Sequence, residues 1–223
     1  MPIKRTNKYF QKEWLKNNNN LKILDLGCTH VNYWPEANHF ADIIDYSKEF
    51  SEKNLKFTKI SPNEKLPFND KEFDYVVLSH VLEHVSNIVN FTHEVERISK
   101  AGYIELPTKL ADNLVIGCDE DDIGHKWWLE FDDINSSLIY SKKIDVIEKF
   151  LSVGSINKLQ EFFEDSLILQ LYWEDKIELR EGNKHKIEKK ITFLNLIRKF
   201  YGKKIRILIS TFRNFLKKKI SKV

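Results

Sequence analysis

Four residues that could bind a small ligand follow the first two apolar runs of the sequence. Asp25, Gly27 and Cys28 stand at the end of residues 21–26, and Asp45 ends the next run. Because glycine lacks a Cβ atom, the chain can turn tightly at Gly27 and approach a ligand closely. A carboxylate at Asp45 can accept hydrogen bonds from both hydroxyls of a ribose. The pattern fits either a nucleoside ligand or loop capping by the two acids.

The residues after Gly27 do not form a dinucleotide-binding fingerprint. Thr29 and Val31 stand where the G-x-G-x-x-G motif requires further glycines. A backbone cradle for a pyrophosphate at a helix N-terminus is therefore poorly supported. A nucleoside without phosphates would not need such a cradle of backbone N–H groups in this loop.

Three histidines could exchange a proton near neutral pH, and each is a candidate general base. His80 follows the fourth apolar run, His84 comes about one helical turn later, and His125 lies further along. The run from His80 to His84 also matches H-x-x-E-H, a zinc-protease pattern that needs both histidines on one helix. Since a strand precedes His80, we expect the helix to begin after it, and we expect no metal site.

Two tryptophans beside a basic residue could contact an acceptor. Trp127 and Trp128 follow Lys126, and aromatic rings with a basic neighbour suit a sugar ring or another planar polar group. The alternative is that both rings simply cover an edge of the sheet. The acidic residues 119–122 could bind a divalent ion, but a solvated turn is the better interpretation.

Short apolar runs predict the strands that must position these residues, and loops and helices separate the runs. This pattern is typical of a parallel α/β sheet with covered faces. Ligands bind such sheets at the carboxyl ends of the strands. Strands are expected at residues 21–26, 40–45, 55–60, 73–78 and 103–106, with a late antiparallel strand at 166–173. Helices are expected at residues 5–16, 84–99 and 141–165.

Four segments in order resemble the class I S-adenosylmethionine-dependent methyltransferases. Residues 23–28 are similar to the first motif of that family, 45–47 to its acidic motif, and 94–107 to its following helix and strand. The fourth segment resembles the branch with an L-P-F signature followed by D-x-V and V-L-E-H. Its matching residues are Leu66, Pro67, Phe68, Asp74, Val76, Val81, Leu82, Glu83 and His84.

The resemblance covers roughly residues 21–107 and implies an α/β fold with a Rossmann-like, doubly wound, mostly parallel sheet. It implies S-adenosyl-L-methionine as cofactor and a small-molecule acceptor. The implied cofactor contacts are Asp25, Gly27, Cys28, Asp45 and Ser79. The family's usual acid after the third strand is missing, so the adenine contact there must come from the backbone, from Asn63 or from Glu64.

Two departures from the family pattern bear on function. Further glycines are missing after Gly27, and the first crossover is interrupted by residues 34–36. A shortened crossover of this kind resembles family members associated with surface-glycan gene clusters, which implies a sugar or glycan-precursor acceptor and polysaccharide biosynthesis. The missing glycines keep a second hypothesis open, namely a non-catalytic binding or scaffold protein on a degenerate methyltransferase fold.

The charge is divided unevenly along the 223 residues. Residues 1–183 contain 22 Lys/Arg and 32 Asp/Glu, whereas residues 184–223 contain 14 Lys/Arg and one acid, Glu188. The acidic body argues against a nucleic-acid partner. We therefore predict a methyltransferase domain at residues 1–182 and a basic helical tail at 183–223.

The tail is expected to form helices at residues 188–201 and 204–220. In the second, apolar residues share one face and lysines and arginines line the rest, which is typical of a helix that lies on an anionic membrane. The alternative is that the apolar face packs on the domain or mediates self-association.

The cellular setting is predicted from what the sequence lacks. It shows no secretory signal and no apolar stretch of roughly 18 residues that could span a membrane. Two cysteines, Cys28 and Cys118, form no disulfide framework. We expect a cytoplasmic protein with the option of peripheral contact at the inner membrane surface.

Overall fold

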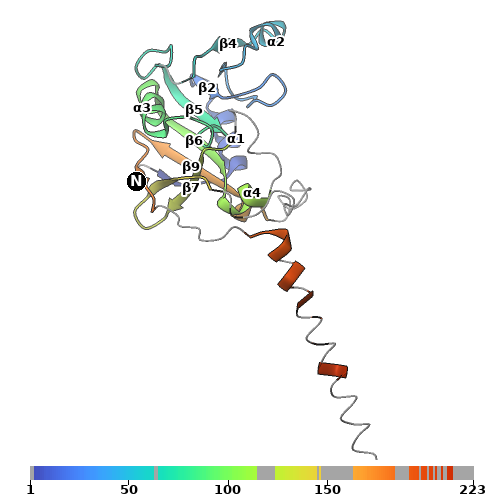
Figure 1. The fold of residues 1–223 in the computed structure, drawn as a ribbon. Helices are drawn as coiled ribbons and strands as arrows, with labels where there is room; N and C mark the ends of the chain where they lie inside the picture. The colour runs from blue at the N-terminus through green and yellow to red at the C-terminus, as the bar shows by residue number, and fades with distance from the viewer. Residues whose placement is uncertain are drawn as a thin grey trace, which may run out of the picture.

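The protein is described by a computed structural model, drawn in Figure 1. Its described residues are 3–62, 65–114, 124–144, 146, 163–183, 191–195, 197–199, 201–202, 204, 207 and 210–212. The predictions for Asn63, for the acidic run 119–122 and for most of the helix at 141–165 lie outside these residues, as does much of the tail.

A seven-stranded sheet forms the centre of the molecule, in the order β1-β9-β6-β5-β2-β3-β4. Strands β2 to β6 are mutually parallel, whereas β9 runs antiparallel to β6 and β1 antiparallel to β9. This confirms the mixed α/β fold and the late antiparallel strand. The bounds are β1 Ile3–Arg5, β2 Ile23–Leu26, β3 His39–Asp42, β4 Lys56–Lys59, β5 Phe73–Ser79, β6 Ser99–Pro107 and β9 Ile168–Glu174.

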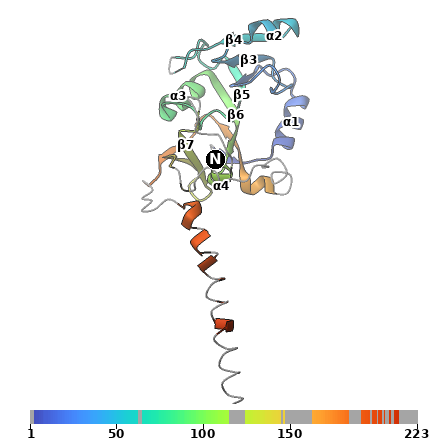
Figure 2. The same cartoon turned by 45° about the vertical axis from the view of Figure 1, so that its right-hand side comes forward.

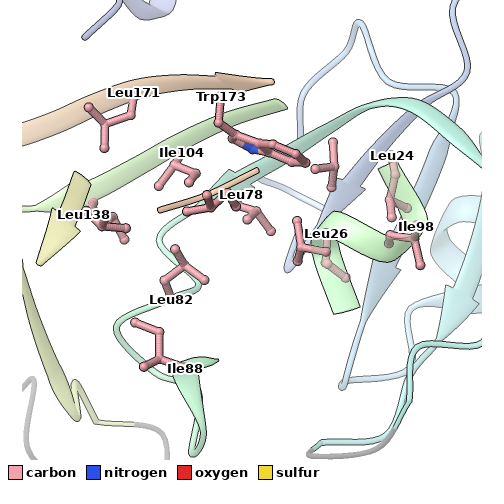
Figure 3. Packing of buried hydrophobic residues seen from close by; sticks show 14 of the residues in the cluster. Leu24, Leu26, Leu78, Leu82, Ile88, Ile98, Ile104, Leu138, Leu171 and Trp173 are labelled. Carbon is pink, nitrogen blue, oxygen red and sulfur yellow. The ribbon is translucent and has the colours of Figure 1, made fainter. Parts of the chain in front are cut away.

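Helices cover both faces of this sheet. Figure 2 shows α3 (Ile88–Ile98) and α1 (Lys8–Asn17) on opposite sides of β5 and β6. The strands are apolar on both faces because successive side chains point in opposite directions. One set, including Leu24, Leu26 and Leu78, packs with α3, as Figure 3 shows in part. The other set packs with α1 and with α2 (Ser47–Glu52).

Element boundaries differ from the prediction where side chains cap the backbone. The expected helix at 5–16 is present as α1 but begins only at Lys8, after strand β1, because Asn7 Oδ1 accepts from Tyr9 N (2.8 Å). The expected helix at 84–99 begins only at Ile88, since Asn87 Oδ1 accepts from Asn90 N (3.0 Å). The second predicted strand ends at Asp42 and not at residue 45.

A smaller three-stranded sheet, in the order β10-β8-β7, was not predicted. It contains β7 (Trp127–Asp132), β8 (Ser137–Lys142) and β10 (Leu179–Glu181), and the short helix α4 (Lys109–Leu114) precedes it in the chain. The strands β7 and β8 form a hairpin whose turn is held by Asp132, which accepts from the backbone of Ile134 and Asn135.

The described pieces of the tail extend away from the body in both views (Figures 1 and 2). Their large apolar side chains are exposed, among them Leu194 (75%) and Phe212 (63%). Among the described residues, no helix has both the length and the apolar character needed to cross a membrane.

Candidate functional site

The chain reverses its strand order between β2 and β5, and this is where a doubly wound sheet opens a ligand crevice. Gly27 and His80 follow these two strands directly, and both have positive φ angles, of 87° and 57°. Gly27 N donates to Ala41 O (2.8 Å) and His80 N donates to Glu105 O (2.9 Å). The two turns are therefore fixed to the neighbouring strands β3 and β6.

A cavity of about 940 Å³ lies at the strand ends. Its volume is near the upper end for small-molecule sites, roughly 300–1,000 Å³. Part of the wall is apolar and the rest carries polar groups, so it can hold a flat apolar ring next to hydroxyl groups. The apolar part includes Leu26, Ile43, Ile44, Ile60 and Leu66, and the polar part includes Asp42, Ser61 and Asn90.

A second cavity, of about 600 Å³, adjoins the first, and both are lined by Gly27, Thr29 and His80. Its other walls carry charged groups of both signs, which suit a polar ligand with several hydrogen-bonding groups. These groups are Lys8, Lys12, Asp25, Glu105 and Glu164.

Glu105 is the centre of the polar contacts in the second cavity. It is only 5% exposed, and it accepts hydrogen bonds from Lys8 Nζ (2.9 Å), Ser79 Oγ (3.1 Å) and Tyr103 OH (2.7 Å). Burial alone would raise the pKa of this carboxyl, but His80, Lys8 and Tyr103 outweigh it and lower the pKa to about 2. Glu105 is therefore a carboxylate at neutral pH.

The position of His80 at the pocket mouth agrees with the prediction, but its protonation state argues against a general base. Its Nδ1 lies 3.2 Å from Glu83 Oε1 and its Nε2 lies 3.5 Å from Glu105 Oε1. Burial would lower the pKa of His80, but hydrogen bonds to Glu105 and Glu83 outweigh it and raise the pKa to about 9. The ring is therefore an imidazolium at neutral pH and has no free site for a further proton.

Asp25 lies on the wall of the second cavity, with 2% of its surface exposed. Its Oδ2 accepts from Trp34 N (2.7 Å), and the Trp34 ring packs 5.0 Å from that of Tyr103. Burial raises the pKa of Asp25 to about 7, although the Trp34 N–H opposes the shift. Asp25 thus lies near half ionisation at neutral pH, where a cationic ligand would shift it to the carboxylate.

Two more of the predicted cofactor contacts, at the ends of β2 and β5, lie at the second cavity. Cys28 and Ser79 both line it, although Cys28 is buried and its Sγ points toward Ala41 O (3.9 Å). Burial raises the pKa of the Cys28 thiol far above its ordinary value, so this group is not a nucleophile at neutral pH.

Two acids lie after β3, and they differ in their surroundings. Asp45 is exposed at the start of α2, where its Oδ1 accepts from Ser47 N (3.0 Å) and Ser47 Oγ (2.6 Å). Asp42 lines the larger cavity, its Oδ1 accepts from Ile44 N (2.7 Å), and burial raises its pKa. Sequence reasoning singled out Asp45 and missed Asp42.

The structure separates the predicted substrate residues from both cavities. Trp128 is 5% exposed and its Nε1 donates to Asp112 Oδ2 (2.7 Å), while Trp127 Nε1 donates to Val85 O (2.7 Å). Neither ring lines either cavity described above. Trp127 therefore joins the smaller sheet to the loop after β5, and Trp128 joins it to α4.

His84 and His125 are brought together at the wall of the larger cavity. His84 lines this cavity, and its ring lies 4.6 Å from that of His125 at an interplanar angle of 77°. His84 lies in a turn before α3, so it does not share a helix with His80. The zinc-protease pattern is therefore not formed.

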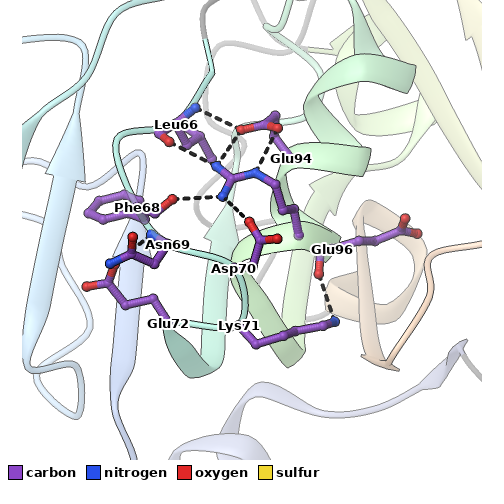
Figure 4. Close-up of polar contacts among 9 residues, drawn as sticks. Leu66, Phe68, Asn69, Asp70, Lys71, Glu72, Glu94 and Glu96 are labelled. Carbon is purple, nitrogen blue, oxygen red and sulfur yellow. Dashed lines mark hydrogen bonds and ion pairs between the residues drawn. The ribbon is translucent and has the colours of Figure 1, made fainter.

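The L-P-F segment is held against the cavity by Arg97 on α3. Its guanidinium donates to Leu66 O (2.9 Å), to Phe68 O (2.7 Å) and to both carboxylate oxygens of Glu94, and Figure 4 shows this set of contacts. Glu94 in turn accepts from Leu66 N (2.9 Å). The motif is thus a structural clamp that places Leu66 on the cavity wall.

Two residues of the second cavity were missed by the sequence reasoning. Glu105 stands near the carboxyl end of a predicted strand, a position that could have identified it. Lys8 reaches Glu105 from 97 residues away in the chain, and no local signal indicates that contact.

A family of known proteins matches the segment that builds this site. Residues 24–104 match the family model described as a methyltransferase domain. The match runs from β2 into β6 and includes the ends of β2 and β5, which frame both cavities. The match indicates a methyltransferase domain over these residues, with S-adenosylmethionine as the cofactor that such a domain uses.

Individual relatives are distant. An uncharacterised protein of Methanocaldococcus jannaschii, MJ1123, is 28% identical over 150 residues, which are 62% of this chain and 65% of the relative. A methyltransferase structure from Archaeoglobus fulgidus is 16% identical with a TM-score of 0.39, covering 75% of this chain and 94% of the other. A methyltransferase structure from Aquifex aeolicus is 13% identical with a TM-score of 0.39, covering 73% of this chain and 88% of the other. Both TM-scores are low, and the assignment of the domain rests on the family match.

The residues at the crevice fit this cofactor. The apolar wall beside Ile43, Ile44 and Ile60 suits an adenine ring, and the acids after β3 suit ribose hydroxyls. Asp25 would offer a negative charge to the ammonium group, and Lys12 a positive charge to the carboxylate.

Proposed function

We propose that the protein transfers a methyl group from S-adenosylmethionine to a small polar acceptor, specifically a sugar or glycan precursor. The observation that carries this proposal is the junction of the two cavities at Gly27, Thr29 and His80. A cofactor with its nucleoside in the larger cavity would place its sulfonium at the junction and its amino-acid end beside Asp25. The part of the second cavity around Glu105 and Lys8 would hold a hydroxylated acceptor.

In this proposal the residues act mainly by positioning. When bound, S-adenosylmethionine supplies an electrophilic methyl group on a sulfonium centre, which is already activated for in-line displacement. Asp25 orients the cationic end of the cofactor, and Glu105 with Lys8 orients the acceptor's hydroxyls. Because His80 carries its own proton, the proton released by the acceptor passes to water. Holding the two reactants in line supplies most of the rate enhancement.

Isothermal titration of the full chain with S-adenosylhomocysteine tests the cofactor half of the proposal. We expect one molecule bound per chain in the micromolar range. Release of S-adenosylhomocysteine from S-adenosylmethionine in the presence of a panel of sugar nucleotides and glycan precursors then tests the acceptor half. Binding without turnover of any polar acceptor would contradict the proposed acceptor class.

A non-catalytic scaffold is the second candidate. The loop between β2 and β3 contains no helix, and Trp34 fills part of the space beside Asp25. If neither the cofactor nor its product changes the melting temperature or produces heat, the scaffold is the better account.

Asp45 is proposed as the acceptor of the ribose hydroxyls, since Ile44 and Tyr46 on either side of it line the larger cavity. Asp45→Asn keeps the oxygen that caps Ser47 and removes the charge. Because hydrogen bonds to a charged group are stronger than those to a neutral one, we expect S-adenosylhomocysteine to bind roughly 10–100-fold more weakly. Titration calorimetry measures this directly.

Asp42→Asn is the matched comparison for this prediction. It changes the other acid after β3, on the wall of the same cavity. A larger loss for Asp42→Asn than for Asp45→Asn would move the ribose site to Asp42 and refute the assignment of Asp45.

We further propose that residues 183–223 form a basic tail which holds the domain 1–182 on an anionic membrane surface. The net charge of the tail supports this, as do the exposed side chains of Phe193, Leu194 and Phe212. Each Lys or Arg near an anionic surface contributes about 1 kcal/mol. A lipid-linked glycan precursor would then be delivered at the same surface.

The full chain should co-sediment with vesicles that contain phosphatidylserine at low ionic strength and dissociate as salt screens the charges. Protein truncated after Gly182 should stay in the supernatant, and neutral vesicles should bind neither form. If the full chain ignores anionic vesicles while truncation breaks a dimer or unfolds the domain, the tail is a packing element instead.

A further inference from the structure

Backbone hydrogen bonds join the loop after β5 to the segment before β7. The residues at this junction have no role in the proposed methyl transfer. Lys126 N and Trp127 N both donate to Glu83 O, at 2.7 and 3.2 Å. These bonds bring His125 beside His84, although 41 residues separate them in the chain. The junction thus places three groups with metal-binding chemistry side by side.

We propose that Glu83, His84 and His125 bind a divalent transition-metal ion, with Zn²⁺ as the best fit. One ligand atom from each residue lies within 4.8 Å of the other two. Two imidazoles and one carboxylate form a ligand set of zinc sites that keep a fourth position for water or substrate. This proposal replaces the expectation, drawn from the sequence, that no metal binds.

Glu83 provides the first independent support. Its side chain is 1% exposed, and Oε2 is buried without a hydrogen-bond partner among the described residues. Its other oxygen, Oε1, lies 3.2 Å from His80 Nδ1. A buried carboxylate oxygen without a partner is costly. A cation bound at Oε2 would remove this cost.

His125 provides the second independent support for the metal site. Its ring is held in the way that the rings of zinc-binding histidines are held. Nδ1 contacts Asp112 Oδ1, and this leaves Nε2 as the ligand atom. Asp112 is 6% exposed and its Oδ2 accepts from Trp128 Nε1 (2.7 Å). A carboxylate behind a metal-binding imidazole fixes the ring and makes the nitrogen a stronger ligand.

Nearby cations limit the affinity without filling the site. His80 contacts the Oε1 atom of Glu83, and Lys143 Nζ lies 3.5 Å from Asp112 Oδ2. Lys126 Nζ donates to Ser86 Oγ (3.0 Å). These groups repel a divalent ion, so we expect micromolar rather than nanomolar affinity. Since His84 lines the larger cavity, the ion would lie at the wall of that cavity.

The test is titration of the full chain, freed of any affinity tag and treated with chelator, with Zn²⁺ in the absence of S-adenosylmethionine. We expect one ion per chain and a higher melting temperature. His84→Gln and His125→Gln should each weaken binding by more than about 100-fold, and Asp112→Asn by about 10–100-fold, the range for a residue behind a ligand. Co²⁺ in place of Zn²⁺ should give the absorption of a four-coordinate site, which His125→Gln abolishes.

His93→Gln is the matched control, because His93 also lines the larger cavity but lies outside the three ligands. It should bind Zn²⁺ as the unchanged protein does. Absence of stoichiometric Zn²⁺, or equal affinity in the His84, His125 and His93 variants, would overturn the proposal. Because binding is measured without cofactor or acceptor, this result is separate from failure of the proposed methyl transfer.

Discussion

The affinity for S-adenosylmethionine should fall as the pH is lowered below about 7, by up to tenfold per pH unit, because Asp25 must ionise to face the cationic end of the cofactor. Asp25→Asn keeps an oxygen that can accept from Trp34 N but loses the charge. We expect this variant to bind the cofactor about 10–100-fold more weakly at pH 8, with a flatter pH profile. Titration calorimetry at pH 5.5 to 8 measures both effects.

The same substitution should have the opposite effect on stability. Burial raises the pKa of Asp25 from 3.8 to about 7, so the folded state holds a proton that the unfolded state has lost. The free energy of unfolding therefore decreases as the pH rises from about 4 to 7, by as much as about 4 kcal/mol at 1.36 kcal/mol per pKa unit. Asp25→Asn removes this loss and should be more stable than the unchanged protein at pH 8 in urea unfolding.

Asp74→Asn is the control, because Asp74 lies near the start of β5, at the end of the strand away from the ligand crevice. A hydrogen bond from Lys100 lowers the pKa of Asp74, so the carboxylate stabilises the folded state. The control should lose stability at pH 8 and bind the cofactor normally. If Asp25→Asn binds normally and is destabilised, Asp25 is a structural residue and the cationic end of the cofactor lies elsewhere.

Gly27→Val should both unfold the crevice and abolish cofactor binding. At Gly27, with φ of 87°, a Cβ atom would lie 2.4 Å from Val81 Cγ2. Backbone strain and overpacking each cost about 1–3 kcal/mol, so we expect a loss of roughly 2–6 kcal/mol in stability. The first contact of such a Cβ atom is with Val81 in the protein itself. Urea unfolding and cofactor titration measure the two losses.

Paired variants separate the two causes at Gly27. Val81→Ala combined with Gly27→Ala relieves the clash but keeps the strain, so the double variant should be more stable than Gly27→Ala alone. Gly202→Ala is the control, since a Cβ atom there meets nothing within 4 Å. A Gly27→Val protein as stable as the unchanged one would show that this turn is not the constrained hinge of the crevice.

The sequence alone predicted the sheet because its signals are local. Apolar runs such as residues 73–78 are typical of buried strands between covering layers, and their order in the chain predicted the parallel sheet that the structure contains. The position of Gly27 and His80 after β2 and β5 was predicted for the same reason. Boundaries were less accurate, since single capping contacts such as that of Asn87 decide them.

The protonation of the site depends on contacts that only the folded chain makes. His80 was predicted as a general base from the ordinary pKa of histidine, yet Glu83 and Glu105 hold it as an imidazolium. Glu105 lies 25 residues away and belongs to the neighbouring strand. A pKa depends on burial and on charges in space, and neither is visible in a run of residues.

The roles of the aromatic and basic residues after β6 were likewise decided by tertiary structure. Trp127 and Trp128 looked like an acceptor surface, but β7 pairs with β8 and directs Trp128 to Asp112 in the interior. Backbone hydrogen bonds to Glu83 O bring His125 beside His84. Helix α1 brings Lys8 against Glu105. The sequence determined the strands and the order of the sheet because burial of apolar runs is a local requirement. The partners of each polar side chain were determined only by packing between distant segments, because hydrogen bonds and charges act over a few ångströms in space, whatever the separation along the chain.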